Sequence, residues 1–241
     1  SGRRTMYGHG YSMLFLAEVY GMTGAEMSGR DRRLEERLAA ALQNAIIATA
    51  SVQSEGGGFP YECSPGPDEG SVTVTQVQGL RACMNVGIAV PRGIIEKSYR
   101  YFESCQNLDG GIRYRAAQTS QPRPAITAAA CAALQYQSNE HTPVGERTWV
   151  WVRTNLIGDE FEGPWSRSWF YYGHFYLAQA VYMRDPTAWD VYYPRVRDML
   201  LARQSEDGSW PGDGTTGSVC GTSLALVVLQ LPYARLPIHH Q

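Results

Sequence analysis

The hexapeptide "QNLDGG", residues 106–111, is decisive for the fold because closely related strings occur twice more in the chain. These are "QSEGGGF" at 53–59 and "QSEDGSW" at 204–210. Gln53 and Gln106 are 53 residues apart, and Gln106 and Gln204 are 98 apart, close to twice 49. The spacing predicts a repeat of about 50 residues, with a degenerate copy near "RTNLIGDEFEGPW" at 153–165. Repeats of this length indicate stacked supersecondary units.

Each repeat is expected to contain two helices of different character. Segment 31–53 has an apolar stripe at helical spacing and a charged remainder, which predicts an amphipathic helix. Segment 71–88 is apolar and almost uncharged, so we expect this helix to be surrounded by protein. The alternation predicts about nine helices, with Pro194 in a first turn or at a kink. The remaining predicted helices cover 9–21, 93–106, 125–135, 146–156, 168–183, 194–204 and 218–231.

This alternation predicts an all-α fold, with buried helices in an inner ring and amphipathic helices in an outer ring. The whole chain, 1–241, would then form a single α/α toroid of helix pairs. A linear solenoid would give the same alternation, so the pattern leaves closure of the ring open.

The loops and helices resemble the prenyltransferase and squalene-oxidase repeat superfamily, which includes the terpene cyclases with their QW repeats. Bacterial members of this superfamily, planctomycete ones among them, are the most similar. The resemblance implies an α/α toroid of about six helix pairs, so an upstream portion is expected to precede this chain. The matching stretches span nearly the whole chain: "MYGHGYSMLFLAEVYGMTG", "GGGFPY", "SVTVTQVQGLRACMNVGIAVP", "CQNLDGGIRY", "WFYYGHFYLAQA", "QSEDGSW" and "TSLALVVLQLPYARLPI".

The resemblance also implies a structural role for the three loops. In QW repeats the Gln caps the end of the preceding helix and stacks on the aromatic residue of its own repeat, while glycine turns the backbone. The residues assigned this role are Gln53, Phe59, Gln106, Gly111, Gln204, Gly208 and Trp210.

The chemistry of the resembled family needs motifs that this chain lacks. Neither the DxDD motif of alkene-protonating cyclases nor the DDxxD motif that holds magnesium diphosphate occurs in the sequence. Zinc-dependent relatives use an Asp, a Cys and a His, but no Asp or Cys precedes His174 in "SRSWFYYGHFYL", and Cys220 stands near the place expected for the His. We therefore expect no metal, no cofactor, and no turnover of squalene or prenyl diphosphates.

With these motifs absent, the resemblance still implies an aromatic central cavity suited to an apolar or isoprenoid ligand. Asp68 is included among the candidate lining residues because related bacterial sequences carry an acid just before "SVTV", where this chain has Gly70. Asp68 could instead be a solvated turn acid or a cap on the helix at Ser71. His9 and His174 could instead be buried histidines bonded to backbone carbonyls. The candidate lining residues are Tyr7, His9, Tyr11, Asp68, Thr73, Gln76, Tyr114, Trp169, Tyr172, His174, Asp213 and Cys220.

Composition excludes several classes of partner. A net charge of −2, from 21 basic and 23 acidic residues, gives no electrostatic footprint for nucleic acid. No stretch of about 18 apolar residues predicts a transmembrane helix.

The five cysteines are widely spaced and odd in number, which disfavours a disulfide framework; Cys83, Cys105 and Cys131 are expected to be buried thiols. The start is not a signal peptide and lacks Met, so we expect a processed or trimmed chain and favour a cytoplasmic location.

Three functions remain open at this point. The first is a terpene cyclase-like or prenyltransferase-like toroid that binds an apolar or isoprenoid molecule. The second is a non-catalytic toroid that binds a protein partner. The third is a polysaccharide-active toroid, which would need paired acids from among Asp68, Asp109, Asp159 and Asp213.

Overall fold

The computed structural model describes residues 5–22, 29–135, 142–158, 169–214 and 216–233. Within these ranges the chain forms nine α-helices and no strand, which confirms the predicted all-α class. A π-helical turn, η1 (Arg153–Ile157), extends α6, and a 3₁₀ turn, η4 (Leu231–Tyr233), follows α9. The helices are α1 (Thr5–Met22), α2 (Gly29–Val52), α3 (Gly70–Asn85), α4 (Arg92–Cys105), α5 (Pro124–Gln135), α6 (Pro143–Val152), α7 (Phe170–Arg184), α8 (Pro186–Leu201) and α9 (Gly217–Gln230).

The chain divides into two compact units. The first contains α1 to α4 and residues 114–118, and the second contains residues 106–113 and α5 to α9.

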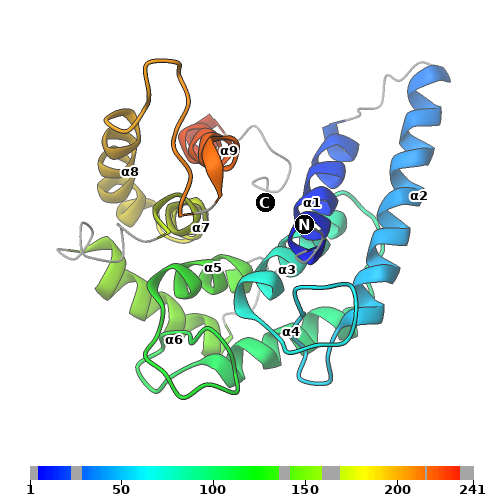
Figure 1. Cartoon of the computed structure of the whole chain (residues 1–241), viewed down its shortest axis with the longest axis horizontal. Coiled ribbons are helices and arrows are strands. Elements are labelled where there is room, and N and C mark those ends of the chain that lie inside the picture. The colour runs from blue at the N-terminus through cyan, green and yellow to red at the C-terminus, as the bar shows by residue number, and fades with distance from the viewer. Residues whose placement is uncertain (1–4, 23–28, 136–141, 159–168, 215, 234–241) are drawn as a thin grey trace. The chain divides into compact units, whose positions relative to one another are not determined.

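In the first unit, α1 lies along α3, while α2 packs on α1 and α4 packs on α3 (Figure 1). Every residue of α3 from Gly70 to Cys83 is buried, including its one charged residue, Arg81, as the near absence of charge predicts. The amphipathic prediction for α2 is confirmed as well, since Leu38, Leu42 and Ile46 are buried while most of the charged residues around them are exposed.

In the second unit, α5 packs against α6 and α7, and α7 also contacts α8 and α9 (Figure 1). Five of the six alanines of α5 are buried, and their small side chains let α7 approach closely: Ala128, Ala129, Ala130, Ala132 and Ala133. Helix α8 begins at Pro186, eight residues before the predicted start, so of the two places predicted for Pro194, a first turn or a kink, the first turn was wrong. Asp185 starts the helix because its carboxylate accepts from the amides of Thr187 and Ala188, and Pro194 lies inside it.

The three Gln loops share one backbone conformation. We name them loop A (53–59), loop B (106–112) and loop C (204–210). In each, the Gln Nε2 donates to the carbonyl of the glycine four residues later, and that glycine has a positive φ of 90°, 96° or 82°. These turn glycines are Gly57, Gly110 and Gly208. In loop B the turn glycine is therefore Gly110 and not the predicted Gly111.

Each loop is also fixed to the helix that follows it in the sequence. The amide of the residue six positions after Gln donates to a threonine hydroxyl of that helix, at 2.9–3.0 Å. The pairs are Phe59 with Thr73, Ile112 with Thr127, and Trp210 with Thr222. Three equivalent bonds at three places in the chain support the repeat that the sequence predicts.

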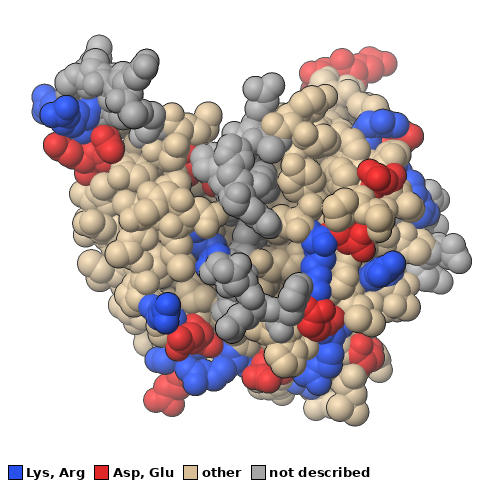
Figure 2. All heavy atoms as spheres, turned by 180° about the vertical axis from the view of Figure 1, so that it is seen from behind, with Lys and Arg blue, Asp and Glu red and all other residues tan. Residues whose placement is uncertain are grey.

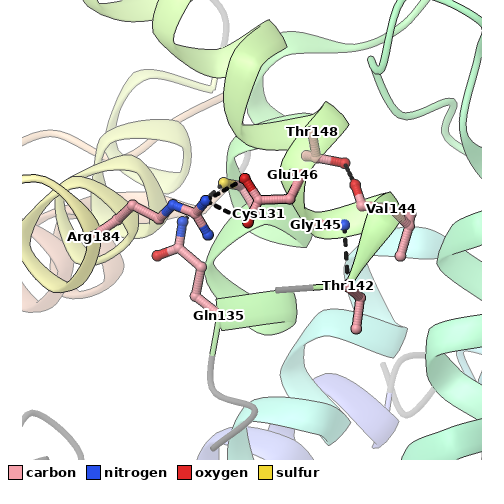
Figure 3. A network of polar contacts seen from close by, with 8 residues as sticks. All are labelled: Cys131, Gln135, Thr142, Val144, Gly145, Glu146, Thr148 and Arg184. Atoms are coloured by element: carbon pink, nitrogen blue, oxygen red, sulfur yellow. Dashed lines mark hydrogen bonds and ion pairs between the residues drawn. The ribbon is translucent and has the colours of Figure 1, made fainter. Parts of the chain in front are cut away.

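The predicted role of Gln as a cap on its own preceding helix was wrong. Gln53 Nε2 donates to the Ile94 carbonyl and Ser98 Oγ of α4, and Gln106 Nε2 donates to the Val144 carbonyl and Thr148 Oγ1 of α6. The long amide thus reaches forward to the next amphipathic helix, because the glycine turn brings the loop against that helix. Figure 3 shows the receiving site on α6, where Thr148 donates to the Val144 carbonyl.

Candidate functional site

Polar groups gather in the first unit at the N-terminal ends of α1 and α3. At their centre is Glu69, which is fully buried and forms the N-cap of α3. Its carboxylate accepts from the amides of Ser71 and Val72 at 3.1 and 3.0 Å, and from Ser71 Oγ at 2.5 Å. Free amides and the helix dipole make this end of a helix favourable for a negative charge, so a buried carboxylate is stable there.

Three tyrosines surround this carboxylate. The Tyr7 hydroxyl hydrogen-bonds to Ser71 Oγ, and the Tyr61 hydroxyl hydrogen-bonds to that of Tyr114, which itself hydrogen-bonds to Glu69. The Tyr7 and Tyr61 rings lie 5.8 Å apart between centroids. Two chains of hydroxyl groups therefore converge on one carboxylate. We call Tyr7, Tyr61, Glu69, Ser71 and Tyr114 the Glu69 cluster.

The phenols of Tyr7 and Tyr114 are held in their protonated form. Burial, and after it the charge of Glu69, raises the pKa of Tyr7 well above its ordinary value. Burial is also the main cause that raises the pKa of Tyr114, together with its hydrogen bonds to Tyr61 and Glu69. Because Tyr7, Tyr61 and Tyr114 are only partly buried, their rings and oxygens combine apolar surface with hydrogen-bonding groups.

A second polar chain joins three helices of the same unit. His9 Nε2 lies 2.9 Å from Thr49 Oγ1 and 3.1 Å from the Ala45 carbonyl, both on α2. Thr49 Oγ1 donates to Gln76 Oε1 at 3.4 Å, and Gln76 Nε2 donates to the Met6 carbonyl at 2.6 Å. These bonds favour the structural alternative for His9, since they tie α1, α2 and α3 together.

The other candidates of the first unit have structural partners. Asp68 accepts from Ser54 Oγ at 2.5 Å, within the turn around loop A, and Thr73 receives the loop A amide. Tyr11 is half-buried on α1 and lies near Tyr7, whose pKa its charge helps to raise. Glu69 is the fully buried acid beside "SVTV", whereas Asp68 is half-buried and belongs to the turn around loop A, as the alternative of a turn acid predicts.

In the second unit, Asp213 and His174 are the buried ionisable candidates. Asp213 accepts from the amides of Tyr171 and Tyr172 at 3.2 and 2.8 Å, at the start of α7. Burial raises the pKa of Asp213, while these backbone bonds lower it. His174 Nδ1 lies 2.9 Å from the Tyr192 hydroxyl, and burial, with the nearby Arg203 charge, lowers the pKa of His174 to about 3. His174 is thus neutral at pH 7 and bonds to a side chain instead of a backbone carbonyl.

Trp169 and Cys220 do not join this arrangement. Trp169 is 48% exposed and precedes α7 in a left-handed conformation, with a φ of 61°. Cys220 is half-buried on α9, and burial raises the pKa of its thiol. Burial raises the pKa of Cys83 and of Cys131 to about 12, and both thiols are buried as predicted, as is Cys105. None of these cysteines has the character of a reactive thiolate.

The polysaccharide hypothesis needs paired acids, and those that the structure describes form hydrogen bonds within the protein. Asp109 accepts from the Gly111 amide and from Trp151 Nε1, so its role is to hold loop B. Asp159 lies outside the described residues. In the ranges that the structure describes, no three His, Cys, Asp or Glu side chains are grouped so that they could hold a metal ion.

Three members of the Glu69 cluster were missed from the sequence: Tyr61, Glu69 and Ser71. The repeat contained a signal for Tyr61, because Tyr61 and Tyr114 both stand eight residues after the Gln of their loops. Their carbonyls also act alike: Tyr61 accepts from the Met6 amide at the start of α1, and Tyr114 accepts from the Gly70 amide at the start of α3. Glu69 could have been chosen over Asp68 because it directly precedes the first residue of α3, where an N-cap belongs.

The surface and the helices add two general findings. Figure 2 shows Lys and Arg next to Asp and Glu on the face that it presents, with charges of both signs interspersed. None of the helices in the described ranges is both long enough and apolar enough to cross a bilayer.

No family model matches the chain, and no curated protein sequence matches it.

Proposed function

We propose that this protein binds an apolar, isoprenoid-type molecule, whose polar end meets the Glu69 cluster. The observation that carries the proposal is the convergence of phenol hydroxyls on a buried carboxylate, with the partly buried Tyr7 and Tyr61 rings packed beside it. Tyrosine suits such a ligand because its ring contacts apolar atoms while its oxygen bonds a polar head. The resemblance to terpene cyclases and prenyltransferases suggests the same ligand class, and a toroid with an aromatic cavity remains our structural hypothesis.

The negative charge of the Glu69 carboxylate favours a ligand with an uncharged head group. A diphosphate would place negative charge beside the Glu69 carboxylate, which is unfavourable in a buried setting. A hydroxyl or carbonyl head group can instead exchange hydrogen bonds with the phenols at no such cost. The ligand we propose is therefore a neutral isoprenoid, such as a prenyl alcohol or a triterpenoid.

Binding without turnover is the form of the proposal that the sequence favours. The chain contains neither DxDD nor DDxxD. Glu69 accepts hydrogen bonds from two amides and two hydroxyls, an arrangement that suits a carboxylate anchor and not a strong acid able to protonate an alkene.

The proposal is tested by equilibrium binding of radiolabelled geranylgeraniol and of geranylgeranyl diphosphate to the purified chain. We expect the alcohol to bind more tightly, and Tyr7→Phe and Tyr114→Phe to weaken it roughly fivefold each, the value of one hydrogen bond. Tyr233→Phe is the matched control, since Tyr233 is 67% exposed and outside the cluster. Equal binding by all four proteins, or preference for the diphosphate, would refute the proposal.

A specific observation also favours the second function, binding of a protein partner. Helix α9 is apolar in composition, yet Val219 and Leu226 are 82% and 44% exposed. The equivalent inner helix α3 is buried along nearly its whole length. Exposed apolar surface of this kind is typical of interaction sites.

A further inference from the structure

Loop C has the conformation of loops A and B but lacks the contact that both of them make. Gln53 and Gln106 each donate to a carbonyl and a hydroxyl of the next amphipathic helix. Gln204 Nε2 donates only to the Gly208 carbonyl, at 3.0 Å, among the described residues. The same amide group is therefore presented in all three loops, and in loop C it faces solvent.

The turn glycines show the same difference. A Cβ added to Gly57 would come within 2.0 Å of the Lys97 carbonyl oxygen, and one added to Gly110 within 2.3 Å of the Arg147 carbonyl oxygen. At Gly208 the nearest described atom would be Gln204 Nε2, at 3.9 Å. Gly57 and Gly110 are buried, whereas Gly208 is exposed. Loops A and B thus press directly on a helix backbone, and loop C presents the same surface uncovered.

The two filled copies define the chemistry of a suitable occupant. Each receiving helix offers a carbonyl in its first turn and a Ser or Thr hydroxyl four residues later: Ile94 with Ser98, and Val144 with Thr148. The residue between, Lys97 or Arg147, is long and basic, and its backbone faces the glycine. Both helices are amphipathic and bury an apolar face.

Apolar surface is available beside loop C. Leu201, three residues before Gln204, is 52% exposed, and Val219 of the following α9 is 82% exposed. At the position of Leu201 the other two loops are preceded by Ala50 and Glu103. The surroundings of loop C can therefore bury apolar side chains that a bound helix would supply.

We propose that loop C and the exposed side chains of α8 and α9 form a docking site for an amphipathic helix of a partner protein. The helix carries Ser or Thr four residues after a first-turn apolar residue, with Lys or Arg just before the Ser or Thr. Gln204 would bind its first-turn carbonyl and hydroxyl, and Gly208 would lie against its backbone. The pattern is taken from α4 and α6, and neither of these helices is the occupant, because loops A and B already bind them. This site is separate from the Glu69 cluster and does not depend on the proposed ligand.

The test uses a peptide of residues 92–104, the sequence of α4, as a surrogate partner. A side-chain lactam between Glu96 and a lysine introduced by Arg100→Lys, both on the exposed face, keeps it helical. The full chain, labelled with ¹⁵N, is titrated to a peptide concentration on the order of 1 mM, where weak docking is visible. We expect saturable shifts of the Gln204 side-chain amide and the Gly208 backbone amide.

Two matched variants decide the outcome. The peptide with Ser98→Ala should weaken binding roughly fivefold, the value of one lost hydrogen bond, and the chain with Gln204→Ala should weaken it roughly thirtyfold, the value of two. The proposal is overturned if these resonances do not move, if both variants bind as tightly as the parent pair, or if the shifts occur at loops A and B instead.

Discussion

Replacing Gln106 by alanine should destabilise the second unit far more than replacing Gln204. Gln106 Nε2 makes two short bonds to α6, at 2.9 Å to the Val144 carbonyl and 2.8 Å to Thr148 Oγ1, and a longer one of 3.4 Å within loop B. At about 1 kcal/mol for each well-formed bond, Gln106→Ala should cost about 2 kcal/mol. Gln204 makes one exposed bond within its own loop, so Gln204→Ala should cost less than about 1 kcal/mol.

The comparison is made by urea unfolding followed by circular dichroism. Both residues belong to the second unit, so the same transition reports both changes. With a urea slope of about 2 kcal/mol per molar, Gln106→Ala should lower the midpoint by about 1 M, and Gln204→Ala by less than half of that. Equal midpoints for the two variants would show that the bonds from loop B to α6 contribute nothing, and the forward-reaching role of Gln would be wrong.

Three further results are expected. Trp210→Ala should cost about 3–5 kcal/mol in a thermal or urea melt, because the ring is 2% exposed and its Nε1 donates to the Leu200 carbonyl; a loss smaller than that of Gln204→Ala would contradict the packing. Gly110→Ala should destabilise the protein more than Gly208→Ala, since both glycines have positive φ but only at Gly110 would the new Cβ meet a helix carbonyl. A melt in which Gly208→Ala is the more destabilising would refute the claim that loop B presses on a helix and loop C does not. Burial lowers the pKa of His174 to about 3, so below about pH 6.5 the unfolded chain binds a proton at His174 and the folded chain does not. The contribution of His174 to stability is therefore present above that pH and falls as the pH drops. The free energy of unfolding should decrease by about 2 kcal/mol between pH 7 and pH 5, and His174→Gln should remove most of that decrease.

The sequence predicted the helices well because their patterns depend on local chemistry. The apolar stripe of α2, the almost uncharged run of α3 and the alanines of α5 each indicate which part of the helix is buried. The start of α8 was harder. Proline is common at the first position of a helix, so Pro186 and Pro194 were both possible starts. The Asp185 carboxylate, which accepts from two amides, fixes the start at Pro186.

The candidate site could be predicted only in part. Tyr7 and Tyr114 were found from their positions on an inner helix and beside a loop, but their link through Ser71 and Glu69 depends on contacts between residues far apart in the chain. The forward reach of Gln53 and Gln106 was missed for the same reason, since the receiving carbonyls lie 41 and 38 residues later. A sequence pattern shows which groups need a hydrogen-bond partner, and only the fold shows which partner is within reach.

The measurement that tests the proposed function most directly is the mass of the purified protein under native conditions, before and after extraction with organic solvent. We expect a fraction of molecules to carry an additional neutral apolar molecule, whose extract gives the fragment pattern of an isoprenoid. That fraction should fall sharply in Tyr7→Phe and be unchanged in Tyr233→Phe. A protein that shows only the mass of the chain, and binds no added prenyl alcohol, would contradict the proposal that the Glu69 cluster receives an isoprenoid.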